Sequence, residues 1–172
     1  MTSVPLLPLS DVDLEVRDHY LDVDGVRLHV RETGGPHAPP VLMLHGMMGH
    51  AREWDTLATA LADRFRVIAL DQRGHGESDH AHDYGVDVMV ADTLAVITRL
   101  GLVRPHLIGH SMGGMIGMVL AAEHPDAVDR LIVIDIAPPS LTTEWGRVDL
   151  PSCWRRWRRR RTPIPRTPSP SG

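Results

Sequence analysis

The sequence predicts an α/β fold, in which a mainly parallel sheet is flanked by helices. Short apolar runs such as residues 41–44 are typical of strands that are covered on both faces. Segments with apolar residues at helical spacing lie between these runs, and the connections are short. This alternation favours parallel strands joined by right-handed crossovers. Active sites in such sheets lie beyond the carboxyl ends of the strands, and the informative loops of this sequence all follow strands.

The N-terminal part is expected to form a β-hairpin. Residues 19–23 and 26–31 alternate apolar and polar side chains around Asp24 and Gly25, which is a strong short-range signal for a hairpin. Glycines and prolines in residues 34–40 then indicate a loop. The apolar run at 41–44 is expected to be the next strand.

Helices and strands are expected to alternate after that strand. The helix at 86–100 ends at Gly101, and the helix leaving the third parallel strand is stopped by Pro125. In order, the expected elements are a helix at 53–62, a strand at 66–70, a helix at 86–100, a strand at 106–108, a helix at 112–123 and a strand at 130–136.

Composition narrows the class of protein. A chain of 172 residues suits one domain, and 42% hydrophobic with 4% aromatic residues predicts a mostly aliphatic core. The single Cys153 excludes an internal disulfide and fits a reducing compartment. The N-terminus lacks a secretory pattern, and no stretch approaches the roughly 18 apolar residues of a membrane span. We therefore expect a cytoplasmic protein with no membrane partner; the sequence leaves the oligomeric state open.

Charge divides the chain into two compositions near Pro151. Residues 1–150 hold eleven arginines and all twenty-two acidic residues, whereas residues 151–172 hold seven arginines and no acid. Five prolines lie in that C-terminal stretch, which excludes regular structure. We expect residues 1–150 to be a folded domain and residues 151–172 to be a disordered tail.

The most informative motif is the pentapeptide Gly109-His110-Ser111-Met112-Gly113. It follows a strand and opens a helix, which is the form of a nucleophile elbow. The serine must adopt a strained backbone conformation, and side chains two residues to either side would collide where strand and helix converge. This arrangement predicts an exposed hydroxyl above the edge of the sheet.

Two other loops follow strands and carry glycines. Residues 45–49, His-Gly-Met-Met-Gly, can aim a backbone N–H at a developing oxyanion, and residues 71–78 follow the next strand. The motifs His-Gly, Asp-x-Arg-Gly-x-Gly-x-Ser and Gly-His-Ser-Met-Gly-Gly occur in the order and spacing seen in the α/β-hydrolase superfamily. The chain resembles the small bacterial serine esterases of that superfamily over roughly residues 17–140, which correspond to the N-terminal half of the family's sheet.

The resemblance implies a role for particular residues. Ser111 would be the nucleophile, and the backbone N–H groups of Met47 and Met112 would form the oxyanion hole, the latter helped by the helix dipole. Gly46, Gly109 and Gly113 would shape the loop and the elbow. The resemblance implies a structural role for residues 71–78, and it implies no cofactor and no metal.

A serine hydroxyl needs a base, and the base needs an orienting acid. In this fold the order along the chain is serine, acid, histidine. Asp135, at the end of a predicted strand, is the candidate acid, although a capping or salt-bridged carboxylate is an equal reading. After Ser111 the only histidine is His124, at the far end of the elbow's own helix, so no base histidine is identified. Asp149 lies too near the change in composition to be credited.

Other polar residues have simpler readings. His45 and His110 are expected to shape the loop and the elbow, not to transfer protons. His80-Ala81-His82-Asp83 looks like a metal site, but no second ligand cluster accompanies it, and a solvated loop is the favoured interpretation.

The function implied is hydrolysis of a small-molecule carboxylic ester or related acyl compound through an acyl-enzyme on Ser111. A C–C bond hydrolase or a cofactor-free haloperoxidase would share these motifs, whereas an Asp-nucleophile dehalogenase or epoxide hydrolase is disfavoured because residue 111 is serine. From other classes, the alternatives are a non-catalytic binding protein or pseudoenzyme, and a nucleic-acid binder acting through the arginine-rich tail. No folded module supports the last, so we expect no nucleic-acid partner.

The tail suggests a hypothesis about the gene. The abrupt change near residue 150 is what out-of-frame translation would produce, and the family's lid region, later strands and base histidine find no counterpart after it. We therefore expect the chain as given to be truncated relative to the family and catalytically inactive.

Overall fold

The computed structural model describes residues 15–136. Within that range the elements are β1 (Val16–Val23), β2 (Val26–Thr33), β3 (Pro40–Leu44), the 3-10 helix η1 (Ala51–Trp54), α1 (Asp55–Leu61), β4 (Arg66–Leu70), α2 (Val86–Arg99), β5 (His106–His110), α3 (Met112–Glu123) and β6 (Arg130–Ile134). The predicted tail at 151–172 lies outside the described residues, so its disorder and reading frame stay predictions.

The six strands form one sheet in the order β1-β2-β4-β3-β5-β6. β1 and β2 form the antiparallel hairpin that the sequence predicts, and β2 continues antiparallel to β4. From β4 to β6 all neighbouring strands are parallel. The predicted α/β class and the mainly parallel sheet are therefore confirmed.

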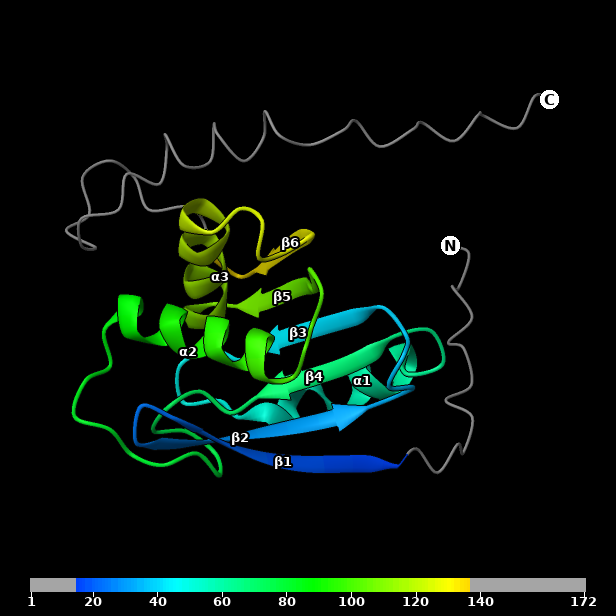
Figure 1. Cartoon of the computed structure of the whole chain (residues 1–172), viewed down its shortest axis with the longest axis horizontal. Helices are drawn as coiled ribbons and strands as arrows, with labels where there is room; N and C mark the ends of the chain where they lie inside the picture. The colour runs from blue at the N-terminus through cyan, green and yellow to red at the C-terminus, as the bar shows by residue number, and fades with distance from the viewer. Residues whose placement is uncertain (1–14, 137–172) are drawn as a thin grey trace, which may run out of the picture.

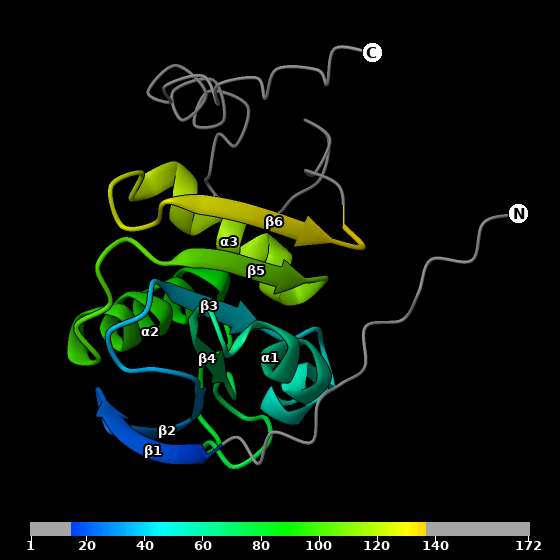
Figure 2. The same ribbon diagram turned by 90° about the vertical axis from the view of Figure 1, so that its right-hand side faces the viewer.

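Helices cover both faces of the sheet. α2 and α3 lie against one face and α1 against the other, as Figures 1 and 2 show from two directions. Successive side chains of a strand point to opposite faces, so alternate residues of each parallel strand pack against the helices on one face or the other. Leu42 and Leu44 pack with α2 and α3 in the larger core, whereas Val41 and Met43 pack with η1 and α1.

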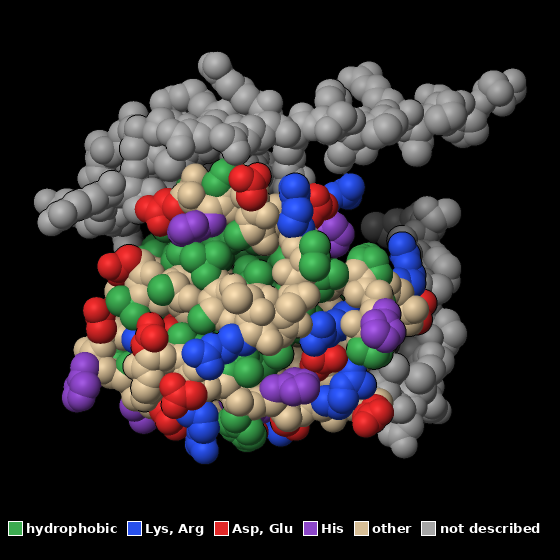
Figure 3. Space-filling model, viewed as in Figure 1, with side chains coloured by type: hydrophobic (Ala, Val, Ile, Leu, Met, Phe, Trp, Pro, Cys, Tyr) green, Lys and Arg blue, Asp and Glu red, His purple; other side chains and the backbone are tan. Residues whose placement is uncertain are grey.

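The surface on the α2–α3 side carries no continuous patch of one charge. Figure 3 shows acidic and basic side chains interspersed around this face, with hydrophobic side chains grouped toward its upper half. Among residues 15–136, no helix is long and apolar enough to span a membrane.

Several element boundaries differ from the predictions; for example, β1 begins at Val16 and not at residue 19, and β5 runs to His110 and not to residue 108. The predicted helix at 53–62 consists of η1 followed by α1, which ends at Leu61. The predicted strand at 130–136 stops at Ile134, because Asp135 adopts a left-handed φ of 57° that cannot continue a strand. That turn lifts the Asp135 side chain out of the sheet, at the same edge as the elbow.

Candidate functional site

Ser111 lies in the sharp turn between β5 and α3. Its backbone angles are φ 45° and ψ −110°, outside the regions that an L-residue prefers. Its N–H donates to the carbonyl oxygen of Ile134 at 2.9 Å, and its own carbonyl accepts from the N–H of Met115 at 3.0 Å. Hydrogen bonds to β6 and within α3 therefore hold the strained residue in place. Such backbone strain is typical of functional sites.

The two flanking glycines are required by close packing. A Cβ atom on Gly109 would lie 2.4 Å from the carbonyl oxygen of Gly113, and one on Gly113 would lie 2.3 Å from the carbonyl oxygen of Leu44. Both obstacles are backbone atoms, which cannot rotate away. The collision expected from the sequence would therefore occur with any larger residue, and the two glycines let α3 pass close to β5 and β3.

Within residues 15–136, the backbone N–H groups of Met47 and Met112 have no hydrogen-bond acceptor. Met112 is the first residue of α3, where no acceptor exists within the helix. Met47 occupies the second position of a turn closed by a hydrogen bond from Gly49 N–H to Gly46 carbonyl at 3.0 Å, and this turn does not use the Met47 N–H. Met48 takes the position with positive φ, at 63°. The Met47 and Met48 side chains are exposed, so the turn stands at the surface.

His45 joins this turn to the elbow and to the loop after β4. The backbone N–H of Gln72 donates to Nε2 of His45 at 3.1 Å, so the ring proton is on Nδ1, which donates to the Gly46 carbonyl at 2.7 Å. Burial lowers the pKa of His45, which keeps the ring neutral. Its carbonyl accepts from the Gln72 side chain at 2.7 Å and from Gly113 N–H at 3.1 Å. These contacts agree with the predicted shaping role.

The candidate acid Asp135 is exposed and lies beside His110. Its carboxylate is 3.8 Å from Nε2 of His110. His110 also lines a cavity of about 180 Å³ with Glu53, Trp54 and Ile134. Glu53 was not foreseen as part of this region, because its place beside His110 and Ile134 depends on contacts between residues far apart in the sequence.

His124 lies far from the nucleophile. It caps the C-terminal end of α3 and is exposed, so roughly 18 Å of helix separates it from Ser111. The prediction that it is a poor base agrees with this position. In the part of the chain that the structure describes, no group of three or more His, Cys, Asp or Glu side chains could hold a metal, and His80 and His82 are exposed.

Comparison with protein families identifies the relationship. The model of the α/β-hydrolase fold family matches residues 39–171 of this chain. The chain belongs to the α/β-hydrolase family. The mainly parallel sheet is thus that of an α/β-hydrolase fold.

Similar proteins carry several hydrolase names. The chain is 42% identical over 106 residues to the mouse sn-1-specific diacylglycerol lipase ABHD11, covering 60% of this chain and 34% of that protein. It is 37% identical over 124 residues to mouse epoxide hydrolase 4, covering 70% of this chain and 34% of the relative. A crystal structure described as a membrane phospholipase A from a bacterium superimposes with a TM-score of 0.70 at 31% identity, covering 75% of this chain and 42% of that one. The chain therefore spans about a third of the length of these curated relatives.

Proposed function

We propose that this chain carries the nucleophile half of a serine hydrolase site, with Ser111 as the attacking residue. The observation that carries the proposal is the strained backbone of Ser111, at φ 45°, between two glycines that backbone contacts force to be glycine. Close beside it, the Met112 N–H at the start of α3 and the Met47 N–H in the exposed turn supply two donors for an oxyanion.

The reaction would run through an acyl-enzyme. The Ser111 hydroxyl oxygen attacks the carbonyl carbon of a small-molecule carboxylic ester, and the two N–H groups stabilise the negative charge on the carbonyl oxygen. The alcohol leaves with a proton, and water then releases the acid. Acylation needs a base that takes the serine proton and gives it to the leaving alcohol, and deacylation needs the same base to take a proton from water and give it to the serine oxygen; Asp135 is the residue proposed to orient that base.

No base for Ser111 is identified among residues 15–136. The one histidine after Ser111 in the sequence, His124, sits at the wrong end of α3. We propose that residues 15–136 alone do not turn over substrate at enzymatic rates.

Serine at position 111 also separates the candidate chemistries. Relatives of this chain bear lipase, esterase and epoxide hydrolase names, so the names do not choose between them. A serine nucleophile favours acyl transfer over the Asp-nucleophile chemistry of epoxide opening. The proposed substrate is thus an ester or related acyl compound.

A serine-directed fluorophosphonate tests the proposal. We expect one label per chain on the peptide that contains Ser111, none in Ser111→Ala, and none after heat unfolding, since the donors must be assembled. A label spread over several hydroxyl residues, or one that persists in Ser111→Ala, would refute it.

A second candidate is a non-catalytic binding protein on the same scaffold. The cavity lined by Glu53, Trp54, His110 and Ile134 beside the elbow favours it, together with the remote position of His124. Quenching of Trp54 fluorescence by a small apolar ligand, without any labelling of Ser111, would support this candidate over the first.

A further inference from the structure

Two consecutive residues hold both ends of the oxyanion loop, defined here as residues 45–51. Gln72 binds the ring and the carbonyl of His45 at its start. The carboxylate of Asp71 accepts the N–H of Ala51 at its end. Asp71 and Gln72 directly follow β4, so the end of one strand fixes the loop that follows its neighbour β3. Any residue that fixes Asp71 therefore acts on the oxyanion loop as well.

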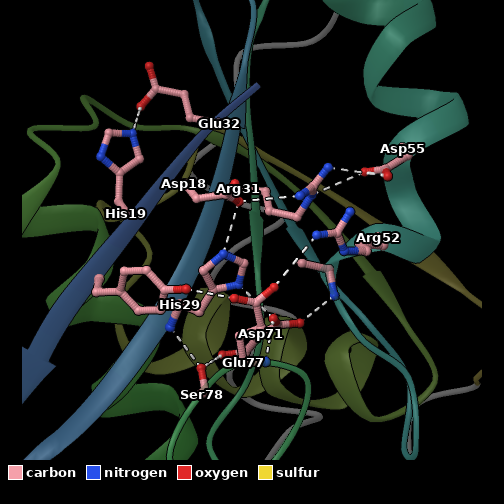
Figure 4. A network of polar contacts seen from close by, with 12 residues as sticks. Asp18, His19, His29, Arg31, Glu32, Arg52, Asp55, Asp71, Glu77 and Ser78 are labelled. Atoms are coloured by element: carbon pink, nitrogen blue, oxygen red, sulfur yellow. Dashed lines mark hydrogen bonds and ion pairs between the residues drawn. The ribbon is translucent and has the colours of Figure 1, made fainter. Parts of the chain in front are cut away.

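Asp71 is held in turn by the buried ring of His29 on β2. His29 Nδ1 lies 2.7 Å from Asp71 Oδ2, and His29 Nε2 lies 3.0 Å from Asp18 Oδ1 on β1 (Figure 4). The ring is about 1% exposed, so water does not compete for these contacts. A direct path of hydrogen bonds thus runs from β1 through β2 and the end of β4 to Ala51.

The Asp71 carboxylate is held in its ionised form. Burial alone would raise the pKa of Asp71, but the N–H groups of Glu77 and Ala51 and the His29 ring outweigh it and hold that pKa below its ordinary value. Asp18 also accepts from Arg31 at 3.3 Å. An ionised carboxylate only accepts hydrogen bonds, so each ring nitrogen that meets one must carry a hydrogen. A ring that donates from both nitrogens is an imidazolium, and the two contacts of His29 have the geometry that this form requires.

Other polar and charged side chains surround the His29 ring and pair with one another. On β1, the Tyr20 ring lies 5.0 Å from the His29 ring between centroids, and its hydroxyl donates to Glu77 at 2.6 Å. Glu77 in turn pairs with Arg52 at 3.6 Å, and Arg31 pairs with Asp55 at 3.3 Å. The Ser78 hydroxyl accepts the backbone N–H of His29 and donates to the carbonyl of Asp71.

We propose that His29 is a positioning residue for the oxyanion loop, acting as a buried imidazolium between Asp18 and Asp71. Its charge-assisted bond orients the Asp71 carboxylate toward the Ala51 N–H, and the loop so fixed presents the Met47 N–H at the elbow. The role of Met47 rests on the proposed function, but the clamp on residues 45–51 does not.

Hydrogen exchange of the whole chain tests the clamp. In His29→Gln the amide of Ala51 is expected to exchange about tenfold faster or more, because the support of a charge-assisted bond is lost. Amides in the centre of β3 are expected to change much less, and the exposed His37→Gln serves as the matched control. Equal acceleration at Ala51 and in β3, or none at Ala51, would overturn the proposal.

A second measurement needs no variant. In wild-type protein labelled with ¹⁵N, His29 is expected to show two protected ring N–H signals, whereas a neutral ring would show one. One signal would overturn the imidazolium. Failure of Ser111 to react with a fluorophosphonate would refute the proposed function but not the clamp. Neither the amide exchange of Ala51 nor the ring N–H signals of His29 depend on that reaction.

Discussion

At the scale of single residues, the turn at Ser111 depends on glycines, because a Cβ atom at Gly109 or Gly113 would collide with backbone atoms. Gly113 has no Cβ, and this lets the first turn of α3 pass within contact of β3, where the Gly113 N–H also reaches the carbonyl of His45 at 3.1 Å. The Ser111 N–H likewise donates a hydrogen bond to the carbonyl of Ile134, at the end of β6. Backbone contacts therefore stabilise the strained conformation of Ser111.

Alanine substitution tests that contact. Gly113→Ala is expected to destabilise the protein by about 3 kcal/mol, because a new methyl carbon would lie 2.3 Å from the backbone oxygen of Leu44. Gly35→Ala is the control, since the nearest atom is a side-chain carbon 4.0 Å away. Urea unfolding of both variants provides the comparison, and similar losses in the two would contradict the account.

Glu32 supplies a pH-dependent contribution to stability. Burial would raise its pKa, but hydrogen bonds from Arg66 and Arg17, each 2.8 Å long, lower it to about 2 from the ordinary 4.5. A lowered pKa means that the stabilisation is complete above the unfolded-state value, near 4.5, and is lost as the pH falls toward 2.

Glu32→Gln is therefore expected to cost about 2 kcal/mol at neutral pH and much less in acid. Urea titrations at several pH values would measure the difference, with the exposed Glu123→Gln as control. A loss that stays constant as the pH falls would show that packing, not ionisation, gives Glu32 its effect.

At the scale of elements, a buried ion pair ties the loop after β4 to α2. Arg73 donates from Nε and Nη2 to the two carboxylate oxygens of Asp92, at 2.6 and 2.7 Å, and this contact raises the pKa of Arg73. Both side chains are buried. The pair fixes the loop that also holds Asp71 and Gln72.

Removing one partner is expected to be worse than removing both. Arg73→Met leaves Asp92 buried and unpaired, at a cost of about 3–5 kcal/mol, whereas Arg73→Met with Asp92→Leu is expected to recover much of that. Chemical denaturation of the three proteins gives the coupling energy. A double variant no more stable than Arg73→Met would contradict this view.

β6 is at one edge of the sheet and has two different faces. Val133 packs against α3, where its side chain approaches Gly114, while Ile132 is 53% exposed on the opposite face. An exposed apolar edge strand promotes association between chains. Ile132→Lys is expected to reduce light scattering with little loss of stability, whereas Val133→Lys is expected to unfold the protein. Equal effects of the two would count against this arrangement.

At the scale of the whole molecule, local signals account for the fold and long-range contacts account for the site. The strands at 41–44 and 66–70 could be predicted because residues 41–44 and 67–70 are unbroken apolar runs, which fit strands covered on both faces. The 3-10 turn at Ala51 could not be predicted, since its start is held by Asp71, twenty residues away. The bonds from Gln72 to His45 and from His29 to Asp71 likewise join separate strands.

The sheet also shows what this chain shares with its family. It brings the turn at Met47, the elbow at Ser111 and the carboxylate of Asp135 to one edge, whereas the last histidine in the chain stands at the other end of α3. The chain spans about a third of its curated relatives. For residues 15–136 we therefore predict an assembled nucleophile with no base beside it.

The most direct test is the rate at which a fluorophosphonate labels Ser111 with and without added imidazole. If nucleophile and oxyanion donors are assembled but the base is absent, labelling is slow alone, rises with imidazole and vanishes in Ser111→Ala. Rapid labelling without imidazole would show that a base lies within the chain. No labelling at any imidazole concentration would show that Ser111 is not a nucleophile, and either result would contradict the account.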